Sequence, residues 1–311
     1  MTIAITLGDP SGIGPEIVAA TLNDAPEELA ARCTVFGDAG VLSRAGLRAT
    51  IDVRAVTALA AADAPPGRPT HAGAVAQVAY LEAAIAAAGG GEIAALVTAP
   101  ISKKQVRAAG LTFPGHTELL AQRLGAPEHA MLFVGPKLRV VLATIHVPLA
   151  AVPALLTPGD IARAVFLGGQ ALVSRFGVPR PRIGVLGLNP HAGEDGLFGD
   201  EEERIVRPGI EAGRARLAAA GPNPIDADVT GPLVPDAAYR TDRDLFVALY
   251  HDQGLIAVKL VDFDLAVNVT LGLPIVRTSP DHGTAYDIAG KNLARKESFA
   301  AALRLASDMI R

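Results

Sequence analysis

The chain has 311 residues, of which 50% are hydrophobic and 19% are charged, a composition typical of a folded globular protein rather than a disordered one. This length supports one large core or two smaller ones, so a two-domain enzyme is expected and a small disulfide-stapled scaffold is excluded. The 28 lysines and arginines face 32 acidic residues, and the net charge of -4 offers no general attraction for nucleic acid or an anionic membrane.

Short runs rich in valine and isoleucine alternate with longer alanine-rich stretches of helical periodicity. This alternation predicts βαβ units, a largely parallel or mixed sheet and therefore an α/β fold. The predicted strands, in chain order, are Ile3–Leu7, Thr34–Gly37, Ala94–Thr98, Met131–Val134, Arg139–Ala143, Arg182–Leu186, Phe246–Tyr250 and Ala266–Val269. The predicted helices are Pro15–Leu22, Ala72–Ala88, Thr117–Leu124, Gly159–Phe176, Glu201–Ala219 and Glu297–Ile310.

The compartment is predicted from three features of the chain. Its single cysteine, Cys33, lies in an apolar stretch that reads as a strand, so it is expected to be a buried core thiol. The amino terminus opens with a strand instead of a basic stretch followed by an apolar core, and no apolar run approaches the roughly 18 to 20 residues of a membrane helix. We therefore expect a cytoplasmic protein that does not enter a membrane.

The opening turn, Leu7-Gly8-Asp9-Pro10-Ser11-Gly12-Ile13-Gly14-Pro15-Glu16, leads from a strand into a helix and resembles a dinucleotide-binding loop. Pro15 suits the first turn of that helix, because its fixed φ fits there and its missing N–H costs nothing. The match to G-x-G-x-x-G fails, however, since Ile17 replaces the third glycine and the acidic residue after the next strand, Asp38, arrives late. A structural turn or a pocket-lining loop is favoured over a Rossmann site.

Three histidines each follow a predicted strand: His146, His191 and His251. Ligands in open α/β sheets bind beyond the carboxyl ends of strands, and neutral imidazoles are common ligands of divalent transition ions. The three lie far apart in the sequence, so no local metal-binding spacing exists, and a lone histidine at a strand end is often a capping or core residue. The repetition of strand followed by histidine favours a metal site.

Two further groups of residues are candidates for binding anions. His116 and Thr117 precede an apolar helical stretch, where N–H groups and the helix dipole attract anions, although Thr117 can equally be a simple N-cap. Lys259 and Arg277 are cations in apolar surroundings, where burial is costly unless an anion is met; pairing with Asp262 or Asp264 is the structural alternative.

The segment Ser279–Asn292 is predicted to be a loop that enters a short helix. Gly283 and Thr284 within it would let a cofactor approach the backbone closely.

Five blocks in order resemble the 4-hydroxythreonine-4-phosphate dehydrogenase (PdxA) family of pyridoxine biosynthesis, and together they cover essentially the whole chain. They are Gly8-Asp9-Pro10 with Gly12-Ile13-Gly14-Pro15-Glu16, Gly115-His116-Thr117-Glu118, Asn189-Pro190-His191-Ala192-Gly193-Glu194, Tyr250-His251-Asp252-Gln253-Gly254, and Asn268-Val269-Thr270-Leu271-Gly272-Leu273-Pro274.

The resemblance implies an isocitrate/isopropylmalate-dehydrogenase-like fold of two α/β domains with a cleft between them. It implies a discontinuous first domain of residues 1–125 and 271–311 and a second domain of residues 126–270. It also implies a homodimer in which His146 and His191 of one subunit and His251 of its partner hold one divalent ion, which would be zinc, magnesium, cobalt or manganese. The substrate-binding positions that it implies are His116, Thr117, Lys259, Asn268 and Arg277. The positions implied for NAD or NADP are His282, Gly283, Thr284, Asp287 and Asn292.

The activity implied by the resemblance is oxidation of the C3 hydroxyl of 4-phosphooxy-L-threonine by NAD, followed by decarboxylation to 3-amino-2-oxopropyl phosphate. An ion would lower the hydroxyl pKa, Lys259 and Arg277 would balance phosphate or carboxylate charge, and Asp252 or a water molecule on the ion would accept the proton. Relatives in the family suggest 4-phospho-D-threonate or 4-phospho-D-erythronate as alternative substrates. A metal-dependent phosphatase or hydrolase and a non-catalytic binding protein are the alternatives from other classes; the former commonly needs bridging carboxylates, and only Glu194 and Asp252 accompany the histidines.

Overall fold

The structure, a computed structural model, describes residues 1–110 and 115–311, which form two compact units. Unit 1 contains Met1–Pro127, Val267–Val269 and Leu273–Arg311, and unit 2 contains Glu128–Ala266 and Thr270–Gly272.

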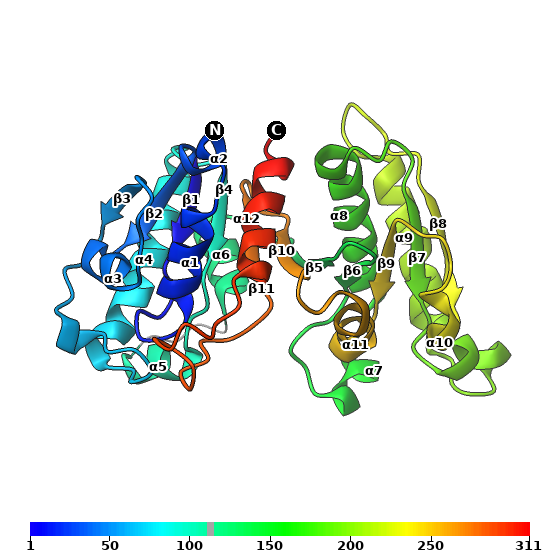
Figure 1. Ribbon diagram of the computed structural model, residues 1–311. Coiled ribbons are helices and arrows are strands. Elements are labelled where there is room, and N and C mark those ends of the chain that lie inside the picture. Colours follow the sequence, from blue (N-terminus) through cyan, green and yellow to red (C-terminus); the bar gives the residue numbers. More distant parts are fainter. Residues whose placement is uncertain (111–114) are drawn as a thin grey trace. The chain divides into compact units, whose positions relative to one another are not determined.

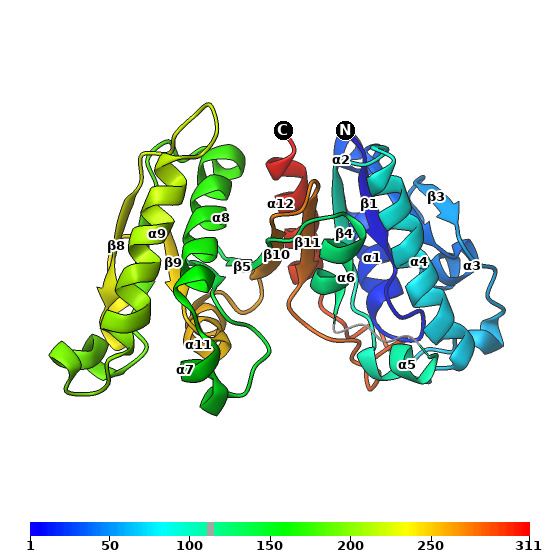
Figure 2. The ribbon, with the colours of Figure 1, turned by 180° about the vertical axis from the view of Figure 1, so that it is seen from behind.

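Unit 1 is built on a sheet in the order β3-β2-β1-β4-β11-β10, in which each pair from β3 to β11 is parallel. Its strands are β1 (Ile3–Thr6), β2 (Cys33–Gly37), β3 (Asp52–Ala55), β4 (Ala95–Thr98), β10 (Val267–Leu271) and β11 (Val276–Pro280). Its helices are α1 (Gly14–Asn23), α2 (Glu27–Ala30), α3 (Ala39–Arg44), α4 (His71–Gly89), α5 (Lys103–Ala108), α6 (His116–Arg123) and α12 (Glu297–Met309), with a 3-10 turn, η1, at Ala61–Asp63. The helices α1 and α12 cover one face of this sheet and α4 and α6 the other (Figures 1 and 2).

Side chains from α4 and α6 meet alternate residues of the strands in the core of unit 1. Leu81 and Leu120 pack there with Ala4, Phe36 and Leu96, all of them buried. The helix α4 is long and apolar enough to cross a membrane by length and composition, but 61% of its apolar window is buried inside the protein. Since α4 also contacts β1, β2 and β4, it is a core helix of unit 1.

Unit 2 has the strand order β5-β6-β9-β7-β8, in which β5 and β6 are antiparallel and the other pairs are parallel. Its strands are β5 (Ala130–Val134), β6 (Arg139–Leu142), β7 (Arg182–Leu186), β8 (Asp228–Leu233) and β9 (Leu245–Ala248). Its α-helices are α7 (Val152–Leu155), α8 (Pro158–Phe176), α9 (Arg207–Ala218), α10 (Pro235–Ala238) and α11 (His251–Asp262). Shorter turns are η2 (Leu149–Ala151), η3 (Pro190–Gly196) and a π-helical turn, η4 (Glu202–Val206). The helices α8 and α9 lie side by side (Figures 1 and 2).

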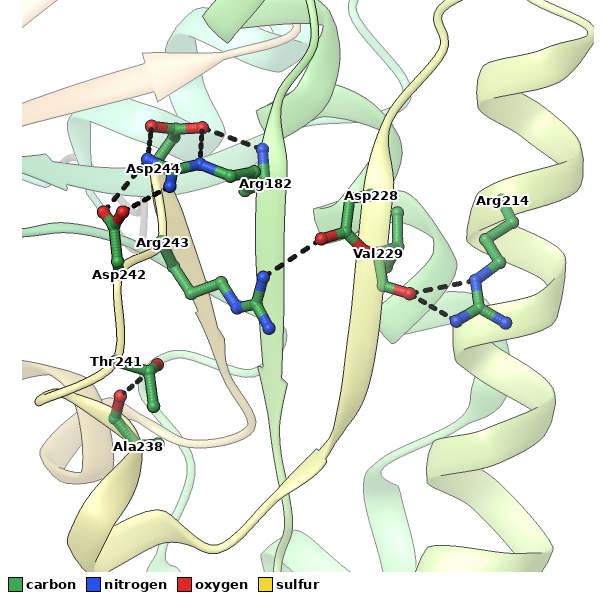
Figure 3. Close-up of polar contacts among 9 residues, drawn as sticks. All are labelled: Arg182, Arg214, Asp228, Val229, Ala238, Thr241, Asp242, Arg243 and Asp244. Carbon is green, nitrogen blue, oxygen red and sulfur yellow. Dashed lines mark hydrogen bonds and ion pairs between the residues drawn. The ribbon is translucent and has the colours of Figure 1, made fainter.

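An ion-pair network lies where β7, β8 and β9 begin (Figure 3). Arg182 pairs with Asp242 and with Asp244, its Nη2 lying 3.0 Å from Oδ1 of Asp244, and Arg243 donates to Asp228 at 3.1 Å. Because these are the amino ends of parallel strands, the network lies at the opposite edge of the sheet from the histidines, which follow the carboxyl ends. We therefore expect this network to stabilise the fold.

The α/β fold class is confirmed, and the eight predicted strands and six of the predicted helices are found with small shifts at their ends, the helix expected at Glu201–Ala219 beginning as the π-helical turn η4. Pro15 lies in the first turn of α1, as predicted. The hydrophobic pattern of the sequence did not predict the strands β3, β8 and β11 or the helix α11. The sequence of α11 mixes glycine with β-branched residues, which have lower helix propensity. The short helix expected within Ser279–Asn292 is wrong: β11 ends at Pro280, and turns fill the segment up to α12.

Candidate functional site

The three candidate metal-binding histidines follow three neighbouring parallel strands. The strands β6, β9 and β7 pair in that order, and they are followed by His146, His251 and His191 respectively. Carboxyl ends of neighbouring parallel strands meet at one edge of a sheet, so the topology brings all three loops to the same edge of unit 2.

Two of these histidines lie together within one chain. The ring centroids of His146 and His251 are 5.9 Å apart, and the planes are tilted by 39°. Both line a pocket of about 220 Å³ whose other walls include Ile145, Val152 and Tyr250. Nδ1 of His251 lies 2.6 Å from Oδ1 of Asp252, which leaves Nε2 as the nitrogen able to bind an ion. The donor set therefore fits part of an imidazole-coordinated transition-metal site.

His191 lies on the turn η3, beside the ring of Phe198 at a centroid distance of 6.0 Å. Across residues 1–110 and 115–311, no group of three or more His, Cys, Asp and Glu side chains could hold a metal ion. The expectation that His146 and His191 of one subunit and His251 of its partner hold one ion therefore stays a prediction. Because β9 is the direct neighbour of β6, the rings of His146 and His251 also lie near each other within one chain.

Lys259 is exposed on α11, so its predicted burial is wrong. The helix, which the sequence analysis missed, turns this residue outward. Asp262 accepts hydrogen bonds from the backbone N–H groups of Lys137 and Leu138 at 3.0 and 3.1 Å. The carboxylate of Asp262 thereby stabilises the turn between β5 and β6.

The other candidate cation lies in unit 1 and is buried, as expected from its apolar surroundings in the sequence. Arg277, on β11, is 3% exposed, and its Nη2 donates to Oγ1 of Thr98 on the neighbouring strand β4 at 2.7 Å. Burial lowers the pKa of this guanidinium to about 10, while the Glu118 carboxylate opposes the shift. A largely buried guanidinium is costly unless an anion joins it, so this position suits a phosphate or carboxylate.

His116 belongs to the same region. Its pKa lies well below the ordinary 6.5, chiefly because the ring is buried, and the charges of Arg277 and Lys103 lower it further. The ring is therefore neutral near neutral pH, and its buried Nε2 has no hydrogen-bond partner among the described residues. The neighbouring cation Lys103 and the strand-end Thr98 were not identified as site residues from sequence, because only the fold brings them to this region.

Thr117 is not the N-cap of α6. That position is held by Gly115, and Thr117 is 4% exposed inside the first turn. The simple capping role considered from sequence is therefore wrong. Asn268, on β10, has a buried Oδ1 without a hydrogen-bond partner in the described part of the chain, which leaves this acceptor available to a ligand.

The segment 281–292, expected to bind the cofactor, packs against the opening turn of the chain. The Ile13 N–H donates to the carbonyl of Thr284 at 2.9 Å, and the Tyr286 hydroxyl donates to Oδ2 of Asp9 at 2.5 Å. Asp9 is 1% exposed and also accepts from Nε2 of Gln77 at 3.2 Å. The opening turn therefore supports this segment.

The carboxylate of Asp38 accepts hydrogen bonds from the backbone. It caps α3 by accepting from the N–H groups of Gly40 and Val41 at 2.9 and 3.1 Å, and it accepts from the N–H of Leu59 at 2.6 Å. These contacts give the Asp38 carboxylate a structural role at the beginning of α3.

A second pocket, of about 160 Å³, lies where the opening turn meets this segment. Gly12, Glu16, Arg44, Gly290 and Asn292 line it, so of the expected cofactor residues it includes Asn292 but not His282, Gly283, Thr284 or Asp287. One Glu16 oxygen accepts from the Gly290 N–H at 3.3 Å, and the other is buried without a partner among the described residues. Burial raises the pKa of this carboxyl group.

Comparison with known proteins identifies the family. Residues 20–306 match the model of the family described as pyridoxal phosphate biosynthetic protein PdxA. A 4-hydroxythreonine-4-phosphate dehydrogenase of Desulfosudis oleivorans is 45% identical over 98% of this chain and 95% of its own length. A D-threonate 4-phosphate dehydrogenase of Cupriavidus necator is 41% identical over 99% of this chain and 96% of its own length.

A solved structure of 4-hydroxythreonine-4-phosphate dehydrogenase from Klebsiella pneumoniae covers 100% of this chain and 99% of its own, with a TM-score of 0.85 and 37% identity. These similarities favour an oxidoreductase over the phosphatase and the non-catalytic binding protein. This chain therefore belongs to the PdxA family and is an oxidoreductase of the 4-hydroxythreonine-4-phosphate dehydrogenase family.

Proposed function

We propose that this protein oxidises the C3 hydroxyl of 4-phosphooxy-L-threonine with NAD or NADP, and that the oxidised acid loses carbon dioxide to give 3-amino-2-oxopropyl phosphate. The observation that carries the proposal is the pairing of His146 with His251 beside a pocket, in a chain whose relatives include 4-hydroxythreonine-4-phosphate dehydrogenases. A phosphorylated hydroxy acid is the substrate class that the family implies.

The residues that would hold the divalent ion are His146, His251 and His191. Imidazole ligands favour a transition ion such as zinc over magnesium, and such an ion supplies Lewis acidity toward a substrate hydroxyl. The contact of 2.6 Å between Asp252 and Nδ1 of His251 supports a positioning role for this carboxylate, because it fixes the ring orientation. Asp252 is also a candidate proton acceptor, since its side chain is 73% exposed.

The residues that would hold the substrate anion lie in unit 1. Arg277 supplies a permanent charge, neutral His116 supplies a ring N–H or a lone pair, and Asn268 supplies an amide. Thr117 and Lys259 complete the proposed substrate-binding set. For the nicotinamide cofactor we propose the segment that contains His282, Gly283, Thr284, Asp287 and Asn292.

We propose a homodimer in which His146 and His191 of one chain and His251 of a second copy hold one ion. An exposed apolar stripe on α11 and its C-cap residue supports self-association: Ile256, Leu260 and the C-cap Phe263 are 68%, 82% and 69% exposed at helical spacing. Because α11 begins at His251, the stripe and the site share one helix. We further propose a cytoplasmic location, since the only cysteine is a free, buried thiol.

Mixed dimers of inactive single variants test this arrangement. If His251 comes from the second copy, mixing His191→Ala with His251→Ala rebuilds one complete site per dimer, and so does mixing His146→Ala with His251→Ala. Mixing His146→Ala with His191→Ala rebuilds none. Recovery in this last mixture, or full activity of any single variant, would contradict the proposal. Activity is measured from the absorbance of the reduced nicotinamide.

A second candidate substrate is D-threonate 4-phosphate, because a relative named for that activity is 41% identical over nearly the whole chain. Assays of zinc-loaded protein with 4-phosphooxy-L-threonine, 4-phospho-D-threonate and 4-phospho-D-erythronate distinguish the amino-acid substrate from the sugar-acid substrates. We expect the highest kcat/KM for the amino acid; a higher value for either sugar acid would overturn that choice.

A further inference from the structure

The loop that carries His191 has an unusual backbone. Five consecutive residues, His191 to Asp195, have φ angles of 54°, 54°, 83°, 42° and 54°. Only one of them, Gly193, is a glycine, and the left-handed region is unfavourable for the other four because Cβ crowds the following carbonyl. Such a turn persists only where its surroundings hold it, and left-handed backbone of this kind is concentrated at functional sites.

A single buried carboxylate holds the beginning of this loop. Glu202 is 2% exposed and opens the π-helical turn η4. Its Oε1 accepts from the backbone N–H groups of Leu188 and Asn189 at 2.7 and 2.8 Å, and its Oε2 accepts from Nδ2 of Asn189 at 3.0 Å. The same amide donates to Oε2 of Glu201 at 2.8 Å.

The loop also packs tightly on this carboxylate after His191. A Cβ placed on Gly193 would lie 2.7 Å from Oε2 of Glu202, and one placed on Gly187 would lie 2.9 Å from the backbone of Ala192. The backbone is therefore closely packed on both sides of His191: Gly193 lies against Glu202, and Gly187 lies against Ala192. No described hydrogen bond, by contrast, links the His191 ring to the rest of the protein.

We propose that Glu202 is a positioning residue, which holds the segment His191–Asp195 in its left-handed form so that His191 is presented as a metal ligand. This inference rests on the proposed role of His191. The buried carboxylate fits the task because it accepts three N–H donors at once, whereas an amide has one oxygen and would place its own N–H₂ against one of them. The π-helical turn directs the carboxylate inward, and such turns recur at functional sites.

The test measures zinc affinity by chelator competition on the purified full-length protein. Glu202→Gln should weaken zinc binding by about 10- to 100-fold, the usual effect of losing a group that orients a metal ligand. Glu203→Gln is the matched control, because Glu203 is 60% exposed and pairs with Arg207 on the surface. It should bind zinc as the parent does. Equal affinities of the Glu202→Gln and Glu203→Gln proteins would overturn the inference.

Two further variants distinguish the possible failures. If His191→Ala leaves zinc affinity unchanged, His191 is not a ligand and the proposed metal site itself fails. If His191→Ala weakens binding and Glu202→Gln does not, only the positioning role fails. The double variant should bind zinc no more weakly than His191→Ala alone, since both act through one ligand; additive losses would show that Glu202 acts on the fold as a whole. Asn189→Ala removes one contact of the Glu202 carboxylate and should give a smaller loss of zinc affinity. This variant also tests the inference if the Glu202→Gln protein does not fold.

Discussion

Arg277 and Thr98 are joined by a hydrogen bond of 2.7 Å between neighbouring strands, with the guanidinium almost completely removed from water. The cost of burying this cation lowers its pKa to about 10. A buried guanidinium at this position suits the binding of an anionic ligand.

Arg277→Met should therefore lower kcat/KM by about 10- to 100-fold, the equivalent of one hydrogen bond to a charged group. The unliganded protein should be no less stable than the parent, because an apolar side chain of similar length removes the cost of the buried charge. Steady-state kinetics and urea unfolding check the two effects. An unchanged kcat/KM would show that the guanidinium does not bind the substrate.

The pH dependence of stability should reveal the neutral state of His116. Its folded pKa is lowered, so between that pKa and the unfolded value of 6.5 the unfolded chain binds more protons than the native one. Stability should accordingly fall as pH decreases through about 6.5, by at most about 1.4 kcal/mol per pH unit for this one group.

Urea unfolding of the parent and of His116→Asn at about pH 7.5 and about pH 5.5 measures this contribution. The variant should lose less stability on acidification than the parent. His71→Asn, which changes an exposed histidine at the start of α4, is the matched control and should behave as the parent does. The same acid sensitivity in parent and His116→Asn would count against a buried neutral ring.

Asp244 should contribute to stability without affecting catalysis. Hydrogen bonds from Arg182 lower its folded pKa, so the stabilisation is present above the unfolded value of 3.8 and is lost as pH falls through the folded pKa. We expect Asp244→Asn to cost about 1 kcal/mol near neutral pH, since the pair is partly exposed. Asp242→Asn should cost less, because that side chain is 84% exposed. Reduced activity at full stability in either variant would place the network at the site instead.

Tyr286→Phe should weaken cofactor binding. Burial, helped by the hydrogen bond to Asp9, raises the pKa of Tyr286 to about 12, so the phenol remains a donor and ties the segment 281–292 to the opening turn. Loss of one such bond, worth about 0.5–1.5 kcal/mol, should raise KM for NAD about two- to tenfold with a smaller change in kcat. Tyr80→Phe, a buried tyrosine hydroxyl that binds Thr57, should leave KM for NAD unchanged.

Local patterns in the sequence were enough to predict the α/β class and most of the strands and long helices, because alternation of valine-rich and alanine-rich segments is a property of neighbouring residues. They were also enough to place His146, His191 and His251 after strands. The short exposed strand β3 lacked such a pattern, and α11 was obscured by Gly254 and its β-branched residues.

Which candidate residues meet was decided only by the tertiary structure. The strand order β6-β9-β7 brings His146 to His251, although 105 positions separate them (251 − 146), and no local pattern encodes that order. Burial likewise separated Arg277 from Lys259, two cations in similar apolar sequence, because β11 is an inner strand of its sheet while Lys259 lies on the outer face of a helix. Side-chain environment depends on packing between distant segments, and a single sequence specifies that packing only through the folded chain.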